Sequence, residues 1–292
     1  MIAVDWGTSS FRAFLLAPDG AIRDRRAAPL GIMAVGDGRF AEALRGQVGA
    51  WLAAGEDHIL LCGMIGSRQG WQEAAYLPCP AGAEAIAAAL VRVPFEGARV
   101  LLVPGLTHAD ASGTPEVMRG EETQLVGVMA ALGGNGIACL PGSHSKWATL
   151  ADGRIMGFAT YMSGEAFAAL RHGTILGRMM QDGPGVPEAF DRGVARSGEP
   201  GHLLHHLFGV RTLGLFGRLS DDKSASYLSG LLIGHEVRAA MPAGASVHLI
   251  GAPALCALYA RTVAAYGGTA VIDDADAAAR GLALIGRNAR WN

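Results

Sequence analysis

The hydrophobic positions of the chain fall into two kinds of segment. Short runs that are apolar or alternate with polar residues predict β-strands, and longer Ala- and Leu-rich segments predict helices. In the first part of the chain the predicted strands cover residues 2–6, 11–17, 21–27, 58–66 and 98–105, and the predicted helices cover residues 39–55, 83–93 and 120–134. The order of these elements is βββαβαβα.

The same order begins again in the second part. The predicted strands cover residues 136–142, 146–150, 154–160, 246–251 and 269–273, and the predicted helices include residues 163–181, 223–241, 253–268 and 276–288. Two copies of βββαβαβα, the second with a long helical insertion, are the plan of a ribonuclease-H-like double domain, which is an α/β fold. We therefore expect two domains, residues 1–133 and 134–292, that face each other across a central cleft.

The first predicted turn is rich in groups that can bind phosphate. It contains Asp5, Gly7, Thr8, Ser9 and Ser10. These residues are common in turns, so the stretch alone fits an ordinary surface hairpin. It also fits a phosphate cradle, in which backbone N–H groups and hydroxyls bind phosphate oxygens and the carboxylate holds Mg²⁺ through water.

A similar hairpin opens the second copy and favours the phosphate interpretation. Its matching residues are Gly142, Ser143, His144, Ser145, Lys146 and Trp147. Both hairpins are followed by an Asp-Gly pair, at residues 19–20 and 152–153. Two such hairpins would bind a polyphosphate from both sides, with Lys146 near the transferred group. Phosphoryl transfer needs mainly such positioning and charge neutralisation.

Composition narrows the class of protein. Half of the 292 residues are hydrophobic and 17% are charged, which is typical of a compact globular protein. Lys and Arg number 24 against 26 for Asp and Glu, so we expect neither nucleic acid nor a membrane as a partner. The first apolar run reaches Asp5 almost at once, unlike a signal peptide. The cysteines are widely spaced without a CxxC pair, which favours free thiols in the cytoplasm: Cys62, Cys79, Cys139 and Cys256.

Several motifs spread along the chain together resemble one family of sugar kinases. They are DWGTSSFRAFL, CGMIGSRQGW, VPGL, RGEETQLVG, LPGSHSKWATL, YMSGEAFAAL and LSGLLIGHE. The chain resembles the 2-dehydro-3-deoxygalactonokinase family, whose members share the actin-like, hexokinase-like ATPase fold. The resemblance implies ATP-dependent phosphorylation of the 6-hydroxyl of 2-dehydro-3-deoxy-D-galactonate in galactonate catabolism, with ATP and Mg²⁺ as cofactors.

The resemblance also implies a catalytic base in the segment RGEETQ. FGGY-type sugar kinases carry a GDQ motif at this place, and its Asp is the base; by that similarity Glu121 is the base here. An acidic residue is also favoured at a helix N-terminus by the dipole alone. Glu122 stays open as the alternative, and because a helix turns by about 100° per residue, only one of the two should face the cleft.

The segment GMIGSRQGW follows a strand at the place where related sugar kinases have a substrate loop. Arginine presents a fork that binds a carboxylate through two hydrogen bonds. Arg68 is therefore our candidate for the carboxylate contact, with Ser67, Gln69 and Trp71 as companions. An arginine exposed on a surface loop is the alternative.

Two further features have both functional and structural interpretations. Gly251 and Ala252 lie at a strand-to-helix turn that accommodates adenosine in this superfamily, although glycine there also serves close packing. The cluster His202, His205 and His206 fits a polar helix face better than a metal site.

Two alternatives to this function remain open from the sequence. One is a kinase of another sugar acid such as 2-dehydro-3-deoxygluconate. The other is an ATPase switch of the actin or chaperone kind. The partners expected are the sugar acid and ATP, and a homodimer is left open.

Overall fold

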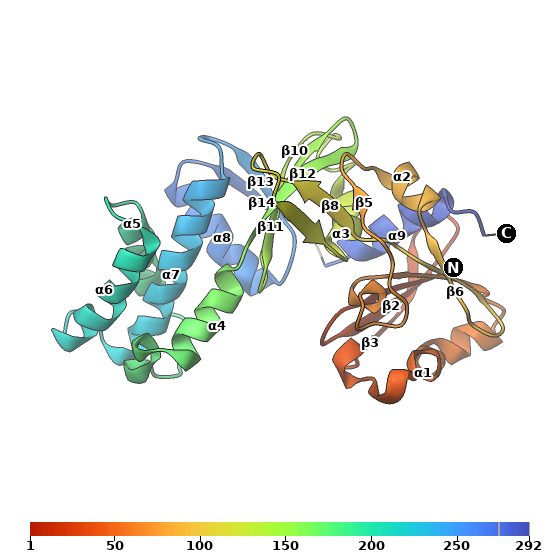
Figure 1. Ribbon diagram of the computed structural model, residues 1–292, viewed down its shortest axis with the longest axis horizontal. Helices are drawn as coiled ribbons and strands as arrows, with labels where there is room; N and C mark the ends of the chain where they lie inside the picture. The colour runs from red at the N-terminus through yellow and green to blue at the C-terminus, as the bar shows by residue number, and fades with distance from the viewer. Residues whose placement is uncertain (274, 292) are drawn as a thin grey trace. The chain divides into compact units, whose positions relative to one another are not determined.

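The computed structural model describes residues 1–273 and 275–291 and consists of mixed strands and helices (Figure 1). Up to α3, its elements are β1 (Ile2–Trp6), β2 (Phe11–Leu16), β3 (Ile22–Ala28), α1 (Phe40–Ala53), β4 (His58–Cys62), β5 (Leu77–Pro78), α2 (Ala83–Ala88), β6 (Val91–Val93), β7 (Arg99–Leu102), β8 (Leu106–Ala109), β9 (Pro115–Met118) and α3 (Glu121–Val128). The later elements are β10 (Gly136–Leu140), β11 (Ser145–Ala151), β12 (Arg154–Tyr161), α4 (Ser163–Gly173), α5 (Pro187–Ser197), α6 (Leu203–Leu215), α7 (Asp221–Ala240), β13 (Ser246–Leu249), α8 (Pro253–Ala265), β14 (Thr269–Ile272) and α9 (Ala277–Arg287).

Two sheets share one strand order. The first runs β3-β2-β1-β4-β7, with β6 added at its edge, and the second runs β12-β11-β10-β13-β14. In the first sheet β1 pairs in parallel with β4 and β4 with β7, whereas β2 and β3 are antiparallel. In the second, β10, β13 and β14 are parallel. The repeated order confirms the predicted α/β fold class of two ribonuclease-H-like halves.

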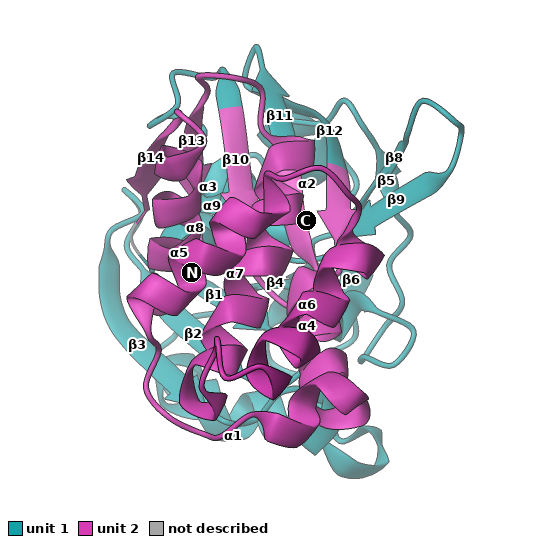
Figure 2. Ribbon diagram, turned by 90° about the vertical axis from the view of Figure 1, so that its left-hand side faces the viewer, with its two compact units in different colours: residues 1–136, 148–158, 274–292 teal, residues 137–147, 159–273 magenta. Residues whose placement is uncertain are grey.

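The chain divides by its internal packing into two compact units (Figure 2). Unit 1 comprises residues 1–136, 148–158 and 274–292, and unit 2 comprises residues 137–147 and 159–273. This division follows packing, whereas the boundary at residues 133–134 was expected from strand order. The predicted domain ranges 1–133 and 134–292 therefore stay a prediction.

Two local details differ from the pattern expected from the sequence. The predicted helix over residues 83–93 ends at Ala88, and Val91–Val93 forms the edge strand β6, which pairs with β7. Val91 and Val93 are β-branched and suit a pleated edge better than a helix. A small sheet in the order β5-β8-β9 was not expected, because each of its strands has at most four residues.

The core of unit 1 fixes the strands that carry the candidate site. The strand β1 is buried along most of its length, as expected for a central strand covered on both faces. The helix α1 buries Phe40, Leu44, Val48 and Trp51 on one face, at the spacing of an amphipathic helix. The polar edge strand β3, by contrast, is largely exposed.

The helices α3 and α9 pack directly on each other within unit 1 (Figure 1). A Cβ atom at Gly127 would overlap the carbonyl oxygen of Ala277, and one at Gly281 would overlap that of Thr123. The two glycines thus allow the backbones to touch, and this contact holds α3 in place. In the described part of the chain no helix is both long and apolar enough to span a membrane.

Candidate active site

The carboxyl ends of β1 and β4 lie next to each other in unit 1. Asp5 is the register partner of Cys62 in this parallel pair. Gly63 follows with a φ of 91°, and a Cβ there would lie 2.8 Å from the Trp6 carbonyl oxygen and 3.2 Å from Asp5 Oδ1. Only glycine fits this position, so the backbone after β4 lies directly against the Asp5 carboxylate.

The N-terminus of α3 meets the same corner. Gly120 precedes the helix with a φ of 107°, and a Cβ on it would lie 3.1 Å from the Cα of Gly63. Glu121 and Glu122 are the first two residues of the helix. Three segments that are distant in sequence therefore bring Asp5 and both glutamates to one place in unit 1.

Asp5 is a partly buried carboxylate with a cation beside it. Its side chain is 12% exposed and forms an ion pair with Arg12, which lies opposite it on β2. Arg12 engages Oδ2, and Oδ1 lies on the side of Gly63.

The turn after Asp5 presents its hydroxyls to solvent. The N–H of Gly7 donates to the Ser10 carbonyl at 2.9 Å, and Thr8, Ser9 and Ser10 are exposed. The N–H of Ile32 donates to the Gly7 carbonyl at 3.0 Å, which ties the turn to the segment after β3. The backbone of this predicted phosphate turn is therefore braced, while its side chains stay accessible.

The two glutamates of α3 have opposite environments. Glu121 is half-buried, and its Oε2 accepts the N–H of Arg119 at 3.0 Å. Glu122 is fully buried and accepts the N–H of Gly120 at 2.6 Å and the Thr123 hydroxyl at 2.9 Å. Burial, aided by the negative charge of Glu121, raises the pKa of Glu122 to about 8.

The loop after β4 separates its four candidate residues. Arg68 is 89% exposed and lies 3.7 Å from Glu73, and Gln69 is also exposed. Trp71 instead packs into the core of unit 1, where its ring stacks on Phe40 with centroids 6.5 Å apart. The Ser67 hydroxyl is buried and has no hydrogen-bond partner among the described residues.

The second predicted hairpin, between β10 and β11, lies in unit 2. Ser143 and His144 are exposed, and the imidazole of His144 contacts the carboxylate of Glu165 on α4. A Cβ at Gly164 would overlap the Gly142 carbonyl oxygen, so the start of α4 lies tightly against the turn.

Ser145 and Lys146 face inward from this hairpin. Ser145 is fully buried, and its hydroxyl lies 2.8 Å from that of Tyr259. Lys146 is 6% exposed and donates to the Thr160 hydroxyl at 2.9 Å.

A buried carboxylate stands behind the hairpin. Glu236 of α7 is 2% exposed and accepts the indole N–H of Trp147 and the hydroxyl of Tyr259, both at 2.8 Å. Burial raises the pKa of Glu236, and these hydrogen bonds oppose the rise. Sequence reasoning missed Glu236, because its position in an apolar helix gives no sign of its partners.

The turn predicted to meet adenosine lies close to the second hairpin within unit 2. A Cβ at Gly251 would lie 3.4 Å from the carbonyl oxygen of Pro141, the residue before Gly142. Ala252 is exposed and precedes the first turn of α8.

Of the three histidines expected on a polar helix face, His202 and His205 are exposed but His206 is not. His206 is fully buried; its Nδ1 lies 3.0 Å from His235 Nε2, and its Nε2 lies 3.2 Å from the Pro200 carbonyl oxygen. Within residues 1–273 and 275–291, no group of three or more His, Cys, Asp or Glu side chains is placed to hold a metal ion.

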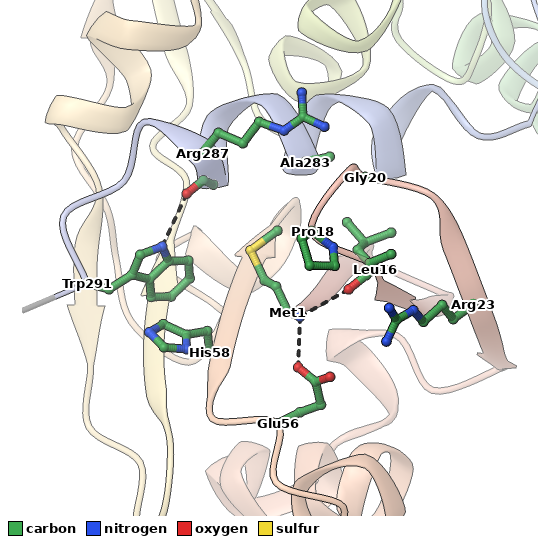
Figure 3. Close-up of a pocket in the computed structure, with 12 residues that line it drawn as sticks. Met1, Leu16, Pro18, Gly20, Arg23, Glu56, His58, Ala283, Arg287 and Trp291 are labelled. Carbon is green, nitrogen blue, oxygen red and sulfur yellow. Dashed lines mark hydrogen bonds and ion pairs between the residues drawn. The ribbon is translucent and has the colours of Figure 1, made fainter.

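A cavity of about 430 Å³ lies elsewhere in unit 1 (Figure 3). It is lined by Met1, Leu16, Arg23, Arg287 and Trp291, among others, and Glu56 binds the N-terminal amine at 2.8 Å beside it. None of the predicted site residues lines this cavity. It lies at the amino end of β1, whereas Asp5 lies near the carboxyl end.

Comparison with known proteins shows the family. The model of the family described as 2-keto-3-deoxy-galactonokinase matches residues 5–285. The chain belongs to this family.

Relatives with the same assigned activity are similar to this protein over nearly the whole chain. A protein of Rhizobium meliloti (strain 1021), assigned the name 2-dehydro-3-deoxygalactonokinase DgoK1, is 37% identical over 99% of this chain and 97% of its own. The 2-dehydro-3-deoxygalactonokinase of Escherichia coli (strain K12) is 32% identical over 91% of this chain and 90% of its own. A Sinorhizobium meliloti crystal structure assigned to the same activity has a TM-score of 0.87 and 38% identity, and covers 98% of this chain and 95% of that one. The family predicted from the motifs is thereby confirmed.

Proposed function

We propose that the protein is an ATP-dependent kinase that phosphorylates the 6-hydroxyl of 2-dehydro-3-deoxy-D-galactonate. The observation that carries this proposal is the family match over residues 5–285, together with the corner of unit 1 that joins Asp5, Gly63 and Glu121. The four cysteines are free in the structure, which supports a reducing cytosol as the place of action.

Glu121 fits the role of general base better than Glu122. A base must come within hydrogen-bond reach of the proton that it removes. Glu121 is half-buried at the start of α3, whereas Glu122 is fully buried and has both of its carboxylate oxygens engaged, by Gly120 and Thr123. In this proposal Glu121 accepts the proton of the 6-hydroxyl as its oxygen attacks the γ-phosphorus of ATP, and ADP leaves.

The phosphates of ATP would be bound by the two hairpins. The residues proposed are Gly7, Thr8, Ser9, Ser10, Gly142, Ser143, His144 and Ser145, with Lys146 supplying positive charge and Gly251 and Ala252 lining the adenosine. The exposed hydroxyls of residues 8–10 and 143 support direct phosphate contact. The buried hydroxyl of Ser145 supports instead a contact through its backbone.

The environment of Asp5 fits a Mg²⁺ ion held mainly by water and phosphate. Mg²⁺ usually needs only one or two protein carboxylates when it accompanies a nucleotide. Asp5 keeps Oδ1 for this role while Arg12 engages Oδ2. When bound, the ion would neutralise phosphate charge during transfer.

The test is ADP release in the presence of a panel of 2-keto-3-deoxy sugar acids. We expect the highest kcat/KM with the galactonate derivative. Replacing Glu121 by Gln should lower kcat by about 10²–10⁴-fold with little change in KM, because a general base acts only in the transition state.

Glu122→Gln is the matched control and should keep most of the activity. Loss of turnover in the Glu122 variant alone would move the base by one residue. A better substrate among the other acids would correct the acceptor, and ADP release independent of any acid would indicate an ATPase switch.

A further inference from the structure

Arg119, between β9 and α3, holds a buried charge with unused hydrogen-bond donors. The residue is 9% exposed, and its Nε and Nη1 atoms have no hydrogen-bond partner among the described residues. Its Nη2 donates to the Ala74 carbonyl at 2.7 Å, and its guanidinium lies 4.5 Å from the centre of the Tyr76 ring. The guanidinium is thus held in a fixed place while two of its nitrogens stay unsatisfied.

A second unsatisfied donor lies next to it along the loop after β4. The Ser67 hydroxyl is buried without a partner among the described residues. Gly66, the preceding residue, lies against the guanidinium, since a Cβ there would be 2.9 Å from Nη1. Two segments of unit 1 therefore bring unsatisfied donors to neighbouring positions.

Buried donors without partners are rare in native proteins, and each costs roughly 1–3 kcal/mol, more when charged. Such a cost is expected where a ligand completes the set of hydrogen bonds. A guanidinium offers only donors and matches the planar oxygens of a carboxylate.

Charge and position favour the carboxylate of the acceptor as this ligand. Arg119 is two residues before Glu121, whose carboxylate accepts its backbone N–H. A six-carbon sugar acid carries its carboxylate and its 6-hydroxyl at opposite ends. One molecule could then place the carboxylate at Arg119 and the hydroxyl at Glu121.

We propose that Arg119, assisted by the Ser67 hydroxyl, binds the carboxylate of the acceptor and selects for acids over neutral sugars. This inference rests on the proposed function. Arg68, by contrast, is 89% exposed and faces Glu73 across a surface loop. Because Nε, Nη1 and the Ser67 hydroxyl are shielded from solvent, the groups packed on the guanidinium, which include Gly66 and the Tyr76 ring, must shift to admit the acid.

The experiment compares Arg119→Lys and Ser67→Ala with Arg68→Ala, using the acid and its neutral amide. Loss of a charge-assisted hydrogen bond should raise KM for the acid by about 10- to 100-fold in Arg119→Lys. Ser67→Ala should raise it by about 5-fold, the middle of the range for a neutral hydrogen bond. KM for ATP should stay unchanged, and the preference for acid over amide should shrink in both variants. A lysine keeps the charge but lacks the fork, so a merely structural role would not alter this preference.

Calorimetric titration with the acid separates this inference from the proposed function. Acid binding by the wild type without any ADP release would overturn the proposed function. Weaker acid binding by Arg119→Lys and Ser67→Ala would still support their role in binding the carboxylate. Normal acid binding by Ser67→Ala and by a folded Arg119→Lys would overturn the proposed role of Arg119 and Ser67 in binding the carboxylate. Weak binding by Arg68→Ala alone would return the role to Arg68.

Discussion

The two predicted phosphate hairpins have the same place in their sheets but different support. The first joins β1 to β2 and the second joins β10 to β11, and each pair lies in the same position of the repeated strand order. Aligned on Gly7 and Gly142, Asp5 corresponds to Leu140 and Arg12 to Trp147. The charged pair of the first hairpin is therefore replaced by an apolar residue and an indole in the second.

Each hairpin is fixed by the partner of its second strand. In unit 1, Arg12 on β2 pairs with Asp5 on β1, so the charges stay within the hairpin itself. In unit 2, the Trp147 side chain on β11 donates to Glu236 on α7, and Ser145 reaches the same carboxylate through Tyr259. One hairpin thus carries its carboxylate within itself, paired with Arg12, whereas the other is supported by a buried carboxylate on α7.

The largest expected effect concerns Asp5, the carboxylate of the first hairpin. Asp5→Asn should lower kcat by at least about 100-fold, because a small displacement of the reacting groups is sufficient for a loss of this size. The fold should persist, since Asp5 lies at the end of its strand and not in the apolar core. Steady-state kinetics at varied Mg²⁺, with circular dichroism as a check of folding, measure this effect.

Asp19→Asn is the matched control for that experiment. It makes the same substitution in the turn between β2 and β3, where the Asp19 side chain accepts the N–H of Ala21 at 3.0 Å. Its activity should equal that of the wild type. Full activity of Asp5→Asn at ordinary Mg²⁺ would show that the first turn is only a structural hairpin.

Much of the fold could be predicted from the sequence, because strand order follows from apolar runs and the turns between them. The segment IAVDW predicts a buried strand, and β1 is one. The strands β5, β8 and β9 escaped prediction because two to four residues give no periodic pattern. The sequence predicts helix for Val91–Val93, which forms β6, because an alanine-rich stretch precedes it directly.

The candidate site could be predicted less completely, since burial and hydrogen-bond partners depend on tertiary contacts. Asp5 and Glu121 were chosen from local motifs, and the structure brings their segments together at Gly63 and Gly120. The roles of Arg119 and Glu236 could not be inferred, because nothing near them in sequence identifies Ala74 or Trp147 as a partner. The pairing of Arg12 with Asp5 could have been predicted from the sequence, since a tight hairpin places Arg12 opposite Asp5.

The next effect tests the support of the second hairpin. Glu236→Leu leaves the Trp147 indole N–H unpaired and removes the acceptor of Tyr259, which should cost about 2–4 kcal/mol in the free energy of unfolding. KM for ATP should rise as well, because Ser145 and Trp147 lose their common support. Urea denaturation and nucleotide kinetics measure the two effects.

Glu236→Gln, unlike Glu236→Leu, should keep most of the stability and a KM for ATP close to that of the wild type. Its amide oxygen can accept the Trp147 N–H while its NH₂ group donates to the Tyr259 hydroxyl oxygen, and the Tyr259 hydroxyl then donates to Ser145. Equal loss of stability in the Gln and Leu variants would show that the negative charge of Glu236 matters, and not its hydrogen bonds.

The smallest expected effect concerns Glu122, the buried carboxyl at the start of α3. Burial raises the pKa of Glu122 from 4.5 to about 8, so the folded protein keeps a proton there that the unfolded chain loses. Between these two values the folded state binds more protons than the unfolded state, and stability must fall as pH rises. The slope from this group is at most about 1.4 kcal/mol per pH unit.

The variant Glu122→Gln tests this prediction. Its side chain cannot titrate, and its amide can hydrogen-bond with both Gly120 and Thr123. Thermal melting at pH 6, 7 and 8 should therefore show that the stability of the variant, relative to that of the wild type, increases with each step in pH. Parallel stability curves for the two proteins would mean that Glu122 is ionised in the folded state throughout this range, despite its burial.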